Sequence, residues 1–589
     1  MANKMKKQLR RLINNILNKE LVFSLRSMTL SERQKSSDYL EWIGSDLVGL
    51  TIEYVRESKM EDSAFIKTMN RAFKTERFII LLKKWLVEYF LSLFSLIDDH
   101  VREKKSLALD DSRVNRFAVE KYFIRFRSRP EIKWGKKQNI IQNAINLTLW
   151  PFIVIFASLN SGIKFAKRRE NLKVMREALW GLKDIGGYYF HDDFFVDGDK
   201  IKKEDLLLFS RGIPTEVGRL KGYCDAGELG YSHFVLGKLP LGADRLAGIL
   251  RRYVILPVEG LFRSINDGNY PVYFSILMYF ANHAIRYEKI FSNYSVISEL
   301  GHNYFVASHI PESIICQYYG VKYYLMHWSD NSGTDNRYIS AFLGCDKYLL
   351  WGSAHFQGHE VPDAQKQFTG YVFKKFINNI NETTLKRDII LNALKIPLER
   401  KIVSFFDETF GGYSGMSEDD HAKLWETALE IAGQMKDITI VIKPKGEANQ
   451  YNFSEQGRKK HDEIYNKISK FHNVRIVYPN KGWSFIEIIG ISDVVITQGM
   501  TSSATIAIIC GKEGLYLQQA DSGHPFSKMF RDKLVFGNPD KLIEMIRNIV
   551  SGTESPLKEI PENILREYDA FRDNLGIDRF TRILSGEIK

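Results

Sequence analysis

The stretch that decides the fold is Asp493-Val-Val-Ile-Thr-Gln-Gly-Met-Thr-Ser-Ser-Ala-Thr-Ile-Ala-Ile-Ile-Cys-Gly-Lys512. Its short apolar run at 494–496 predicts a buried parallel strand, Gly499 allows a sharp bend, and residues 504–510 predict a helix. The hydroxyl-bearing residues 501–503 stand where that helix begins. A helix N-terminus binds anions, and in a doubly wound sheet it borders the ligand crevice. The stretch therefore predicts phosphate binding, most readily of a nucleotide diphosphate. An ordinary helix cap is the alternative.

Strands and helices alternate on both sides of this stretch, from about residue 186 onwards. The predicted helices are 311–319 and 419–435, and the other predicted strands are 303–309, 322–327, 347–351, 401–406, 438–442 and 474–478. Such alternation predicts parallel sheets. The charged, Asn-rich segment 374–400 lies between two series of strands and is predicted to hold the linker. We therefore predict an α/β fold with two Rossmann-like domains, 186–380 and 381–589, that face each other across a cleft.

Residues 1–185 predict a mostly helical extension ahead of these domains. Residues 76–98 are its richest apolar part, but the charged residues among them favour a packed amphipathic helix over a membrane span. Residues 1–20 are basic and predict an amphipathic helix, because they lack the continuous apolar core and the cleavage site of a signal peptide.

Residues 146–159 predict a membrane-docking segment within this extension. They are apolar, contain Trp150 and Pro151, and lie between clusters of Lys and Arg. The run is shorter than the roughly 18 to 20 residues that a membrane span needs. An apolar patch with basic flanks suits the interface of an anionic membrane. A core helix with solvated flanking charges is the alternative.

The balance of charge predicts an anionic partner. Lys and Arg total 83, and Asp and Glu total 71, which gives a formal net charge of +12. This charge suits a polyanion or an anionic membrane, and because no RNA-binding signature accompanies it, we predict the membrane surface and no nucleic acid. The four cysteines show no metal-ligand spacing, which favours a reducing cytosol. We therefore predict a cytoplasmic protein, peripheral on the inner face of the membrane.

Residues suited to a transfer reaction follow several predicted strands. His309 and His327 lie at strand ends, where the scaffold can fix a general base. Lys443 and Lys445, on either side of Pro444, offer fixed positive charge to a phosphate. Ordinary loop histidines and surface lysines are the alternatives.

The segment after a further predicted strand at 514–518 adds two candidates. Asp521 offers a carboxylate to ribose or sugar hydroxyls, and His524 offers its ring to a phosphate or an acceptor. A plain turn explains the same residues equally well. Dinucleotide-dependent oxidoreductases, NTPases and hydrolases are less well supported, because the chain has no Gly-x-Gly-x-x-Gly, P-loop or Gly-x-Ser-x-Gly motif. A metal-dependent transferase with a single Rossmann domain is also less well supported, because no obvious Asp-x-Asp metal site lies at a strand end.

Taken in order, these motifs resemble those of the GT-B glycosyltransferases of bacterial surface-polysaccharide synthesis, over about residues 186–550. Capsule and surface-carbohydrate biosynthesis proteins are the most similar group, and CDP-glycerol glycerophosphotransferases are more distant. Met326-His327-Trp328 stands where the family has Gln-His-Gly. Tyr348-Leu-Leu-Trp351-Gly352 stands for its aromatic run ending in Trp-Gly.

The second half of the chain carries the rest of the resemblance. Lys443-Pro-Lys-Gly446 is similar to Lys-Pro-His-Pro, and residues 501–512 are similar to Ser-Ser-x-x-x-Glu-Ala-x-x-x-Gly-Lys. Phe405-Phe406-Asp407 resembles the surface-carbohydrate group. Ile506 stands where many relatives carry the acidic residue that holds the donor ribose.

The resemblance implies a GT-B-like, metal-independent glycosyltransferase without a cofactor. It implies transfer of a sugar from a nucleotide-activated donor to a lipid-linked glycan, in capsule or lipopolysaccharide synthesis. His327 is the implied general base, with His309 in reserve. The implied donor-binding residues are Lys443, Lys445, Thr501, Ser502, Ser503, Asp521 and His524.

Three alternatives stay open. A polyol-phosphate transferase of the same fold would move glycerol or ribitol phosphate from a CDP donor. A nucleotide-sugar epimerase would need neither an acceptor nor a membrane patch. A catalytically degenerate scaffold, suggested by Trp328 and Ile506, would only bind glycan or recruit partners.

Overall fold

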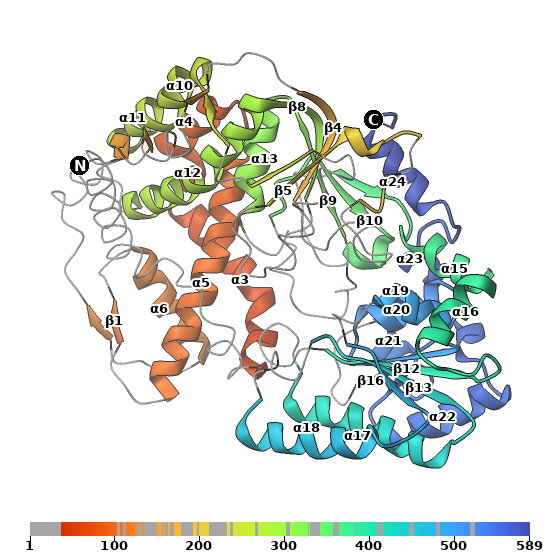
Figure 1. The fold of residues 1–589 in the computed structure, drawn as a ribbon. Helices are drawn as coiled ribbons and strands as arrows, with labels where there is room; N and C mark the ends of the chain where they lie inside the picture. Colours follow the sequence, from red (N-terminus) through yellow and green to blue (C-terminus); the bar gives the residue numbers. More distant parts are fainter. Residues whose placement is uncertain are drawn as a thin grey trace, which may run out of the picture.

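The computed structural model describes residues 37–102, 107–109, 113–126, 132–134, 150–152, 154–155, 158, 163–164, 170–177, 193–196, 199–210, 232–235, 239–264, 269–301, 307–327, 329, 342–356, 365–382, 384–408, 416–446, 451, 453–478, 483–518 and 525–588. Two parallel sheets lie in separate α/β domains, and helices from the N-terminal part flank the first domain (Figure 1). This GT-B-like architecture confirms the predicted fold class. The amphipathic helix predicted at 1–20 lies outside the described residues.

The first sheet has seven parallel strands in the order β11-β10-β9-β8-β4-β5-β6. They are β4 (Glu170–Glu177), β5 (Leu206–Ser210), β6 (Ser232–Val235), β8 (Tyr294–Gly301), β9 (Lys322–Met326), β10 (Lys347–Leu350) and β11 (Gln365–Phe368). The central strand β4 falls within the segment predicted as a helical extension. Its side chains alternate between two cores, with Val174 in one and Met175 in the other, as in a strand buried on both faces.

The second sheet has six parallel strands in the order β14-β13-β12-β15-β16-β17. They are β12 (Ile402–Phe406), β13 (Thr439–Lys443), β14 (Val474–Ile476), β15 (Val494–Gln498), β16 (Glu513–Leu517) and β17 (Val535–Phe536). Every residue of β12, β13 and β15 is buried, which explains why these strands read as continuous apolar runs. The five strands predicted between residues 401 and 518 are confirmed. The domain limits stay predictions.

Serine caps begin three helices of the second domain. Ser417, Ser454 and Ser484 each accept a hydrogen bond from a first-turn amide of α17 (Glu418–Gln434), α18 (Glu455–Ile468) and α19 (Phe485–Ile491). The helix predicted at 419–435 is thereby confirmed as α17. Asn538 caps α22 (Pro539–Ser551) in the same way.

The segment 374–400, which is predicted to hold the linker, forms two helices. They are α15 (Lys374–Glu382) and α16 (Thr384–Ala393). Although the segment is rich in Lys and Asn, Ile380 and Leu391 are fully buried. Helix α15 packs closely on α19, because a Cβ at Gly490 would lie 2.7 Å from Cδ1 of Ile380. A few well-spaced apolar residues therefore outweigh the polar composition.

The N-terminal helices form an outer layer of the first domain. They are α3 (Ser37–Glu57), α4 (Ala64–Phe73), α5 (Phe78–Arg102) and α6 (Arg113–Phe126). Their buried residues share one core with α12 (Tyr270–Asn293) and with one face of the first sheet. Helix α5 confirms the packed amphipathic helix predicted at 76–98. Two short parallel strand pairs lie outside the large sheets, β1 (Leu107–Leu109) with β2 (Ile132–Trp134) and β3 (Ile163–Lys164) with β7 (Leu241–Gly242).

The described residues of the segment predicted to dock on a membrane, 150–152, 154–155 and 158, include both buried and exposed side chains. Trp150 is fully buried, and its Nε1 donates a hydrogen bond to the backbone carbonyl of Tyr253 at 2.5 Å. The tryptophan is therefore not an interfacial anchor in this structure, whereas Phe152 is 65% exposed. Tyr253 lies in a continuous helical stretch of α10 (Ala243–Leu250), the π-helical turn η6 (Arg251–Ile255) and α11 (Leu256–Arg263). No helix among the described residues has the length and apolarity to cross a membrane.

The C-terminal end of the chain returns from the second domain to the first. After α23 (Glu562–Tyr568), helix α24 (Gly576–Leu584) lies beside the first sheet (Figure 1). Ser298 of β8 donates from Oγ to the carbonyl of Leu584 at 3.0 Å, and the rings of Phe580 and Phe194 lie 5.3 Å apart. The last helix therefore packs on the first domain.

Candidate functional site

The second sheet reverses its strand order between β12 and β15, since later strands are added on both sides of β12. In doubly wound sheets, ligands bind outside the carboxyl ends of the strands at such a point. Here Gln498 joins the two strand ends, because its Oε1 accepts a hydrogen bond from the backbone N of Glu408 at 3.1 Å. The candidate site therefore comprises the loops and helix ends that follow β12, β13 and β15.

Helix α20 (Ser502–Ile509) begins at this point, as the sequence predicts. Thr501, Ser502 and Ser503 form its half-buried N-terminus. Thr501 is the extended N-cap residue, but among the described residues its side chain does not cap the helix. This N-terminus therefore differs from those of α17, α18 and α19. Its first-turn amides and helix dipole suit a bound anion.

Gly499 forms the turn between β15 and α20. Its φ of +63° lies in the left-handed region. A Cβ at this position would lie 2.3 Å from Cε of Met416 and 3.0 Å from Oε1 of Gln518. The same Gln518 atom accepts a hydrogen bond from the backbone N of Met500 at 3.2 Å. Close packing thus fixes the backbone immediately before α20.

Both predicted lysines contact other groups of the second domain. Lys443 ends β13, is buried, and donates from Nζ to the carbonyl of Val477 at 3.2 Å. Burial lowers the pKa of Lys443 to about 8, although neighbouring carboxylates oppose this shift. Lys445 forms an ion pair with Glu408. A phosphate at this strand end would compete with the Val477 carbonyl and the Glu408 carboxylate for these cations.

Asp407 is a buried carboxylate to which the sequence reasoning gave no role. It follows β12, and its Oδ1 accepts hydrogen bonds from the backbone N of Lys445 at 2.6 Å and from Tyr451 Oη at 2.9 Å. Its Oδ2 accepts one from Nε1 of Trp425 at 3.3 Å. Burial raises the pKa of Asp407 to about 7, although these bonds favour the charged form. The available signal was an acidic residue directly after a buried strand.

In the first domain, His327 follows β9 and is held by aromatic rings. It is 2% exposed, and its Nδ1 lies 2.8 Å from Tyr348 Oη. The indole of Trp351 lies 5.1 Å from the His327 ring, and its Nε1 donates to the His327 carbonyl at 2.8 Å. These contacts orient the imidazole through one of its two nitrogens.

His355, which the sequence reasoning missed, packs against His327. The two rings lie 4.6 Å apart. Nε2 of His355 lies 3.1 Å from the carbonyl of Tyr568, and because a carbonyl can only accept, this nitrogen carries the hydrogen. The backbone N of Ala570 donates to the carbonyl of Trp351 at 2.9 Å. The segment after α23 therefore supports the ring cluster around His327.

One contact brings the two strand-end regions together. Oγ of Ser329, two residues after His327, lies 2.7 Å from Oγ of Ser502, the first residue of α20. The serines belong to different domains and are 173 residues apart in the chain. The neighbourhood of the predicted base therefore meets the predicted phosphate-binding helix.

The remaining predicted residues are not joined to this meeting point by the described contacts. His309 is buried and begins α13 (His309–Tyr318), so the prediction of a strand tip there is wrong. The neighbouring strand β8 already ends at Gly301, and residues 303–306 of the predicted strand lie outside the described residues. Asp521 and His524 also lie outside them. Within the described ranges, no group of His, Cys, Asp and Glu is suited to hold a metal ion.

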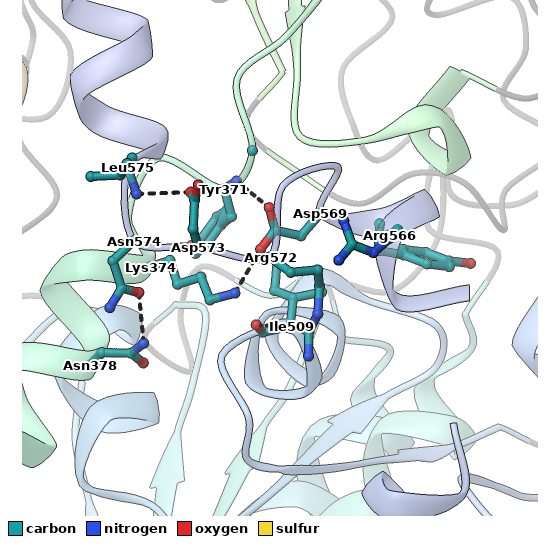
Figure 2. Close-up of polar contacts among 12 residues, drawn as sticks. Tyr371, Lys374, Asn378, Ile509, Arg566, Asp569, Arg572, Asp573, Asn574 and Leu575 are labelled. Carbon is teal, nitrogen blue, oxygen red and sulfur yellow. Dashed lines mark hydrogen bonds and ion pairs between the residues drawn. The ribbon is translucent and has the colours of Figure 1, made fainter. Parts of the chain in front are cut away.

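A segment after α23 joins the first domain to the far end of α20 (Figure 2). Asp569 accepts hydrogen bonds from Nζ of Lys374 at 2.8 Å and from the backbone N of Tyr371 at 3.2 Å. Arg572 donates from Nη1 to the carbonyl of Ile509 at 2.9 Å. The same short segment thus contacts the chain that follows the first sheet and the last residue of α20.

No protein-family model and no curated protein matches this chain. Solved structures are similar to it in fold. The UDP-GlcNAc 2-epimerase from Neisseria meningitidis, bound to UDP-GlcNAc, has 14% identity over 71% of this chain and 99% of its own, with a TM-score of 0.39. The wall teichoic acid polymerase TagF has 11% identity over 76% and 96%, with a TM-score of 0.41. The UDP-GlcNAc 2-epimerase from Methanocaldococcus jannaschii, in complex with UDP-GlcNAc and UDP, has 10% identity over 71% and 99%, with a TM-score of 0.37.

Proposed function

We propose that this chain is a glycosyltransferase of GT-B type that moves a sugar from a nucleotide-activated donor to a glycan acceptor. The contact between Ser329 and Ser502 carries the proposal, since Oγ atoms from the two domains lie 2.7 Å apart there. It brings the strand end that holds His327 to the N-terminus of α20. A transfer that inverts configuration needs a base and a phosphate site on opposite sides of one carbon atom, so the proposed reaction is an inverting one, with the base and the phosphate site at this meeting point.

In the proposed reaction, the acceptor hydroxyl attacks the anomeric carbon of the donor sugar. The new C–O bond forms as the bond from that carbon to the phosphate oxygen breaks, and a nucleoside diphosphate leaves. The hydroxyl proton moves to Nε2 of His327, because the contact of Nδ1 with Tyr348 orients the ring. The N-terminus of α20 and the ammonium group of Lys443 stabilise the charge on the leaving phosphate. This scheme uses neither a metal nor a cofactor.

The proposed acceptor is a lipid-linked glycan of a bacterial surface polysaccharide, reached from the inner face of the cytoplasmic membrane. Two observations support a membrane surface. The chain has a net charge of +12. Ile255 and Phe262, seven residues apart on one helical stretch, are 61% and 66% exposed. Helix geometry places residues at this spacing on the same face, next to the basic residues Arg251 and Arg263.

The experiment that tests donor binding is a thermal-shift panel with CDP, UDP, GDP, dTDP and CMP. A ligand that binds the native state alone raises the melting temperature by mass action. We expect one nucleotide to do so and the Ser503→Asp variant to lose at least about tenfold in affinity, because the new carboxylate repels the phosphate. Acidic residues in a first helical turn favour the helix, so the variant should keep its stability.

Asn538→Asp is the matched control, because it places a carboxylate at the N-terminus of α22. It should leave nucleotide binding unchanged. Phosphorus in the transferred group would identify a polyol-phosphate transferase instead, and turnover of a nucleotide sugar without an acceptor would identify an epimerase. If no nucleotide binds, the chain is not a nucleotide-dependent transferase, and the degenerate scaffold becomes the better interpretation.

A further inference from the structure

The loop after β13 is held by two buried side chains, Asp407 and Tyr451. The backbone N–H groups of Lys445 and Gly446 donate to Oδ1 of Asp407 at 2.6 Å and to Oη of Tyr451 at 3.0 Å. Tyr451 Oη itself donates to Oδ1 of Asp407 at 2.9 Å. Since this hydroxyl accepts one bond and donates another, its orientation is defined. Asp407 thus fixes two consecutive amides of the loop that follows Lys443, directly at Lys445 and through Tyr451 at Gly446.

The same carboxylate lies next to Lys443. Strands β12 and β13 pair with Phe406 opposite Lys443, which places Asp407 beside the end of β13. Burial lowers the pKa of Lys443 to about 8, and the negative charge of Asp407 acts in the opposite direction. Without that charge, burial would make Lys443 neutral at a lower pH, and a neutral amine would bind a phosphate poorly.

Titratable groups face Asp407 and Lys443 from every element packed around them. They are Glu408, Lys445, His421, Tyr451, His461 and Glu487. Nδ1 of His421, on α17, lies 3.9 Å from Oδ2 of Asp407. Burial lowers the pKa of His421 to about 3, so this ring is neutral wherever Asp407 titrates. Lys445 and Glu408 pair with each other.

An ionised Asp407 costs folding stability. Its pKa is raised by burial from 3.8 to about 7, so the folded protein holds this proton more tightly than the unfolded chain. The resulting stability is present below about pH 4 and is lost as the pH rises through about 7. An asparagine could accept the two bonds at Oδ1 without this cost, but its Nδ2 could not accept the bond that Trp425 Nε1 donates to Oδ2. At the 443–446 loop and Lys443, the feature that only the aspartate supplies is its charge.

We propose that Asp407 is a positioning residue of the donor site, which fixes the 443–446 loop and keeps Lys443 cationic for the donor phosphates. This inference rests on the proposed function and deepens it. Ionised Asp407 and protonated Lys443 coexist between about pH 7 and pH 8, so donor affinity is highest in that window. Acid removes the charge that holds the loop, and alkali removes the charge on the lysine.

The test compares Asp407→Asn with Tyr451→Phe. The dissociation constant of the nucleotide found in the panel is measured by calorimetry for both variants and the native protein, from about pH 6 to pH 9. We expect Asp407→Asn to bind about tenfold more weakly near pH 8 and its alkaline loss of affinity to begin at a lower pH. Tyr451→Phe keeps the carboxylate, so it should weaken binding without moving the alkaline limb. The nucleotide titrates in the same way in every measurement, so its own contribution to the pH profile cancels when the variants are compared with the native protein.

A second measurement does not depend on any ligand. The rate at which Lys443 reacts with trace acetic anhydride is followed against pH by peptide mass spectrometry, because only the neutral amine reacts. We expect its midpoint to fall in Asp407→Asn and to stay in Tyr451→Phe. Circular dichroism confirms that each variant is folded.

The outcomes separate this inference from the proposed function. If the native protein binds no nucleotide, the proposed function fails, and the Lys443 midpoint still decides the role of Asp407. If nucleotide binds and Asp407→Asn leaves both the pH profile and the Lys443 midpoint unchanged, the inference is wrong. If, in Asp407→Asn, the Lys443 midpoint and the alkaline loss of nucleotide affinity both move to a lower pH, the inference is supported.

Discussion

The two sheets have the same order of strands but carry different chemistry at their strand ends. In each, the first strand is central and later strands are added on both sides of it. In the first sheet, the end of β9 holds His327 among the rings of Tyr348, Trp351 and His355. In the second sheet, the end of β12 holds Asp407 under a loop of backbone amides. Topology sets where a site can lie, and the side chains set its chemistry.

The two strand ends therefore suit two different tasks, proton transfer in the first sheet and phosphate binding in the second. Ring packing fixes the direction of one imidazole, which suits a group that moves a proton. Hydrogen bonds to a carboxylate fix the loop that carries Lys445 and follows Lys443, which suits a group that binds phosphate. Changes in the first sheet should therefore affect turnover, and changes in the second should affect donor affinity.

The largest expected effect is on turnover in His327→Asn. The asparagine can keep the contact with Tyr348, but it removes the nitrogen that would receive the acceptor proton. We expect the transfer rate to fall by about 10²- to 10⁴-fold while the nucleotide dissociation constant stays within about twofold. His472→Asn, at an exposed histidine of the second domain, is the control and should change neither quantity. Loss of donor binding in His327→Asn would contradict the separation of tasks.

The second-largest effect should come from the ion pair through which the segment after α23 contacts the start of α15. Lys374 and Asp569 form an ion pair with side chains only 7% and 1% exposed. Removing one partner leaves a buried charge, so Asp569→Ala should lower the free energy of unfolding by about 3–5 kcal/mol. Urea unfolding followed by tryptophan fluorescence measures this loss.

The matched control for this pair lies at the surface. Lys533 and Glu559 also form an ion pair, but their side chains are 57% and 53% exposed. Glu559→Ala should cost less than about 1 kcal/mol, because exposed pairs contribute little. Equal losses in the two variants would show that the segment after α23 does not join the domains through a buried charge pair.

The strands of the second sheet and the start of α20 could be predicted from the sequence, for physical reasons. Parallel strands buried on both faces give short apolar runs, and β12, β13 and β15 therefore stand out. The start of α20 is visible because hydroxyl residues and an apolar helix follow a glycine bend. These elements could be predicted because each depends on residues that are neighbours in the sequence.

Other parts depend on contacts between distant residues and leave no local signal. The strand β4 reads as charged, yet it is central because both cores meet on it. The approach of Ser329 to Ser502 depends on how the domains meet, which no local pattern encodes. Asp407 gains its raised pKa only when α17 and the 443–446 loop cover it. His309 was misassigned because the strand before it ends eight residues earlier, at Gly301.

Close backbone packing at the end of the first sheet should have a moderate effect. A Cβ at Gly352 would lie 2.2 Å from the carbonyl oxygen of Glu567 in α23. Gly352→Ala should therefore cost about 1–3 kcal/mol of unfolding free energy. Gly433→Ala on α17 is the opposite case, because nothing lies within 4 Å of its Cβ position. It should stabilise the protein by about 0.5–1 kcal/mol, since alanine favours a helix over glycine. Thermal unfolding of the two variants measures the loss of stability in Gly352→Ala and the gain in Gly433→Ala.

The smallest expected effect on stability belongs to the exposed apolar face of the first domain. Ile255 and Phe262 are largely exposed, so changing both to serine should alter the unfolding free energy by less than about 1 kcal/mol. Vesicles of anionic phospholipid should nevertheless bind the double variant several-fold more weakly in sedimentation, because apolar area and basic charge act together at a membrane. Met529→Ser, at a residue that is 51% exposed in the second domain, is the control and should sediment like the native protein. Equal binding by all three proteins would mean that this face does not dock the first domain on lipid. Weaker binding by the double variant alone would place acceptor access on the first domain and leave the second to the donor.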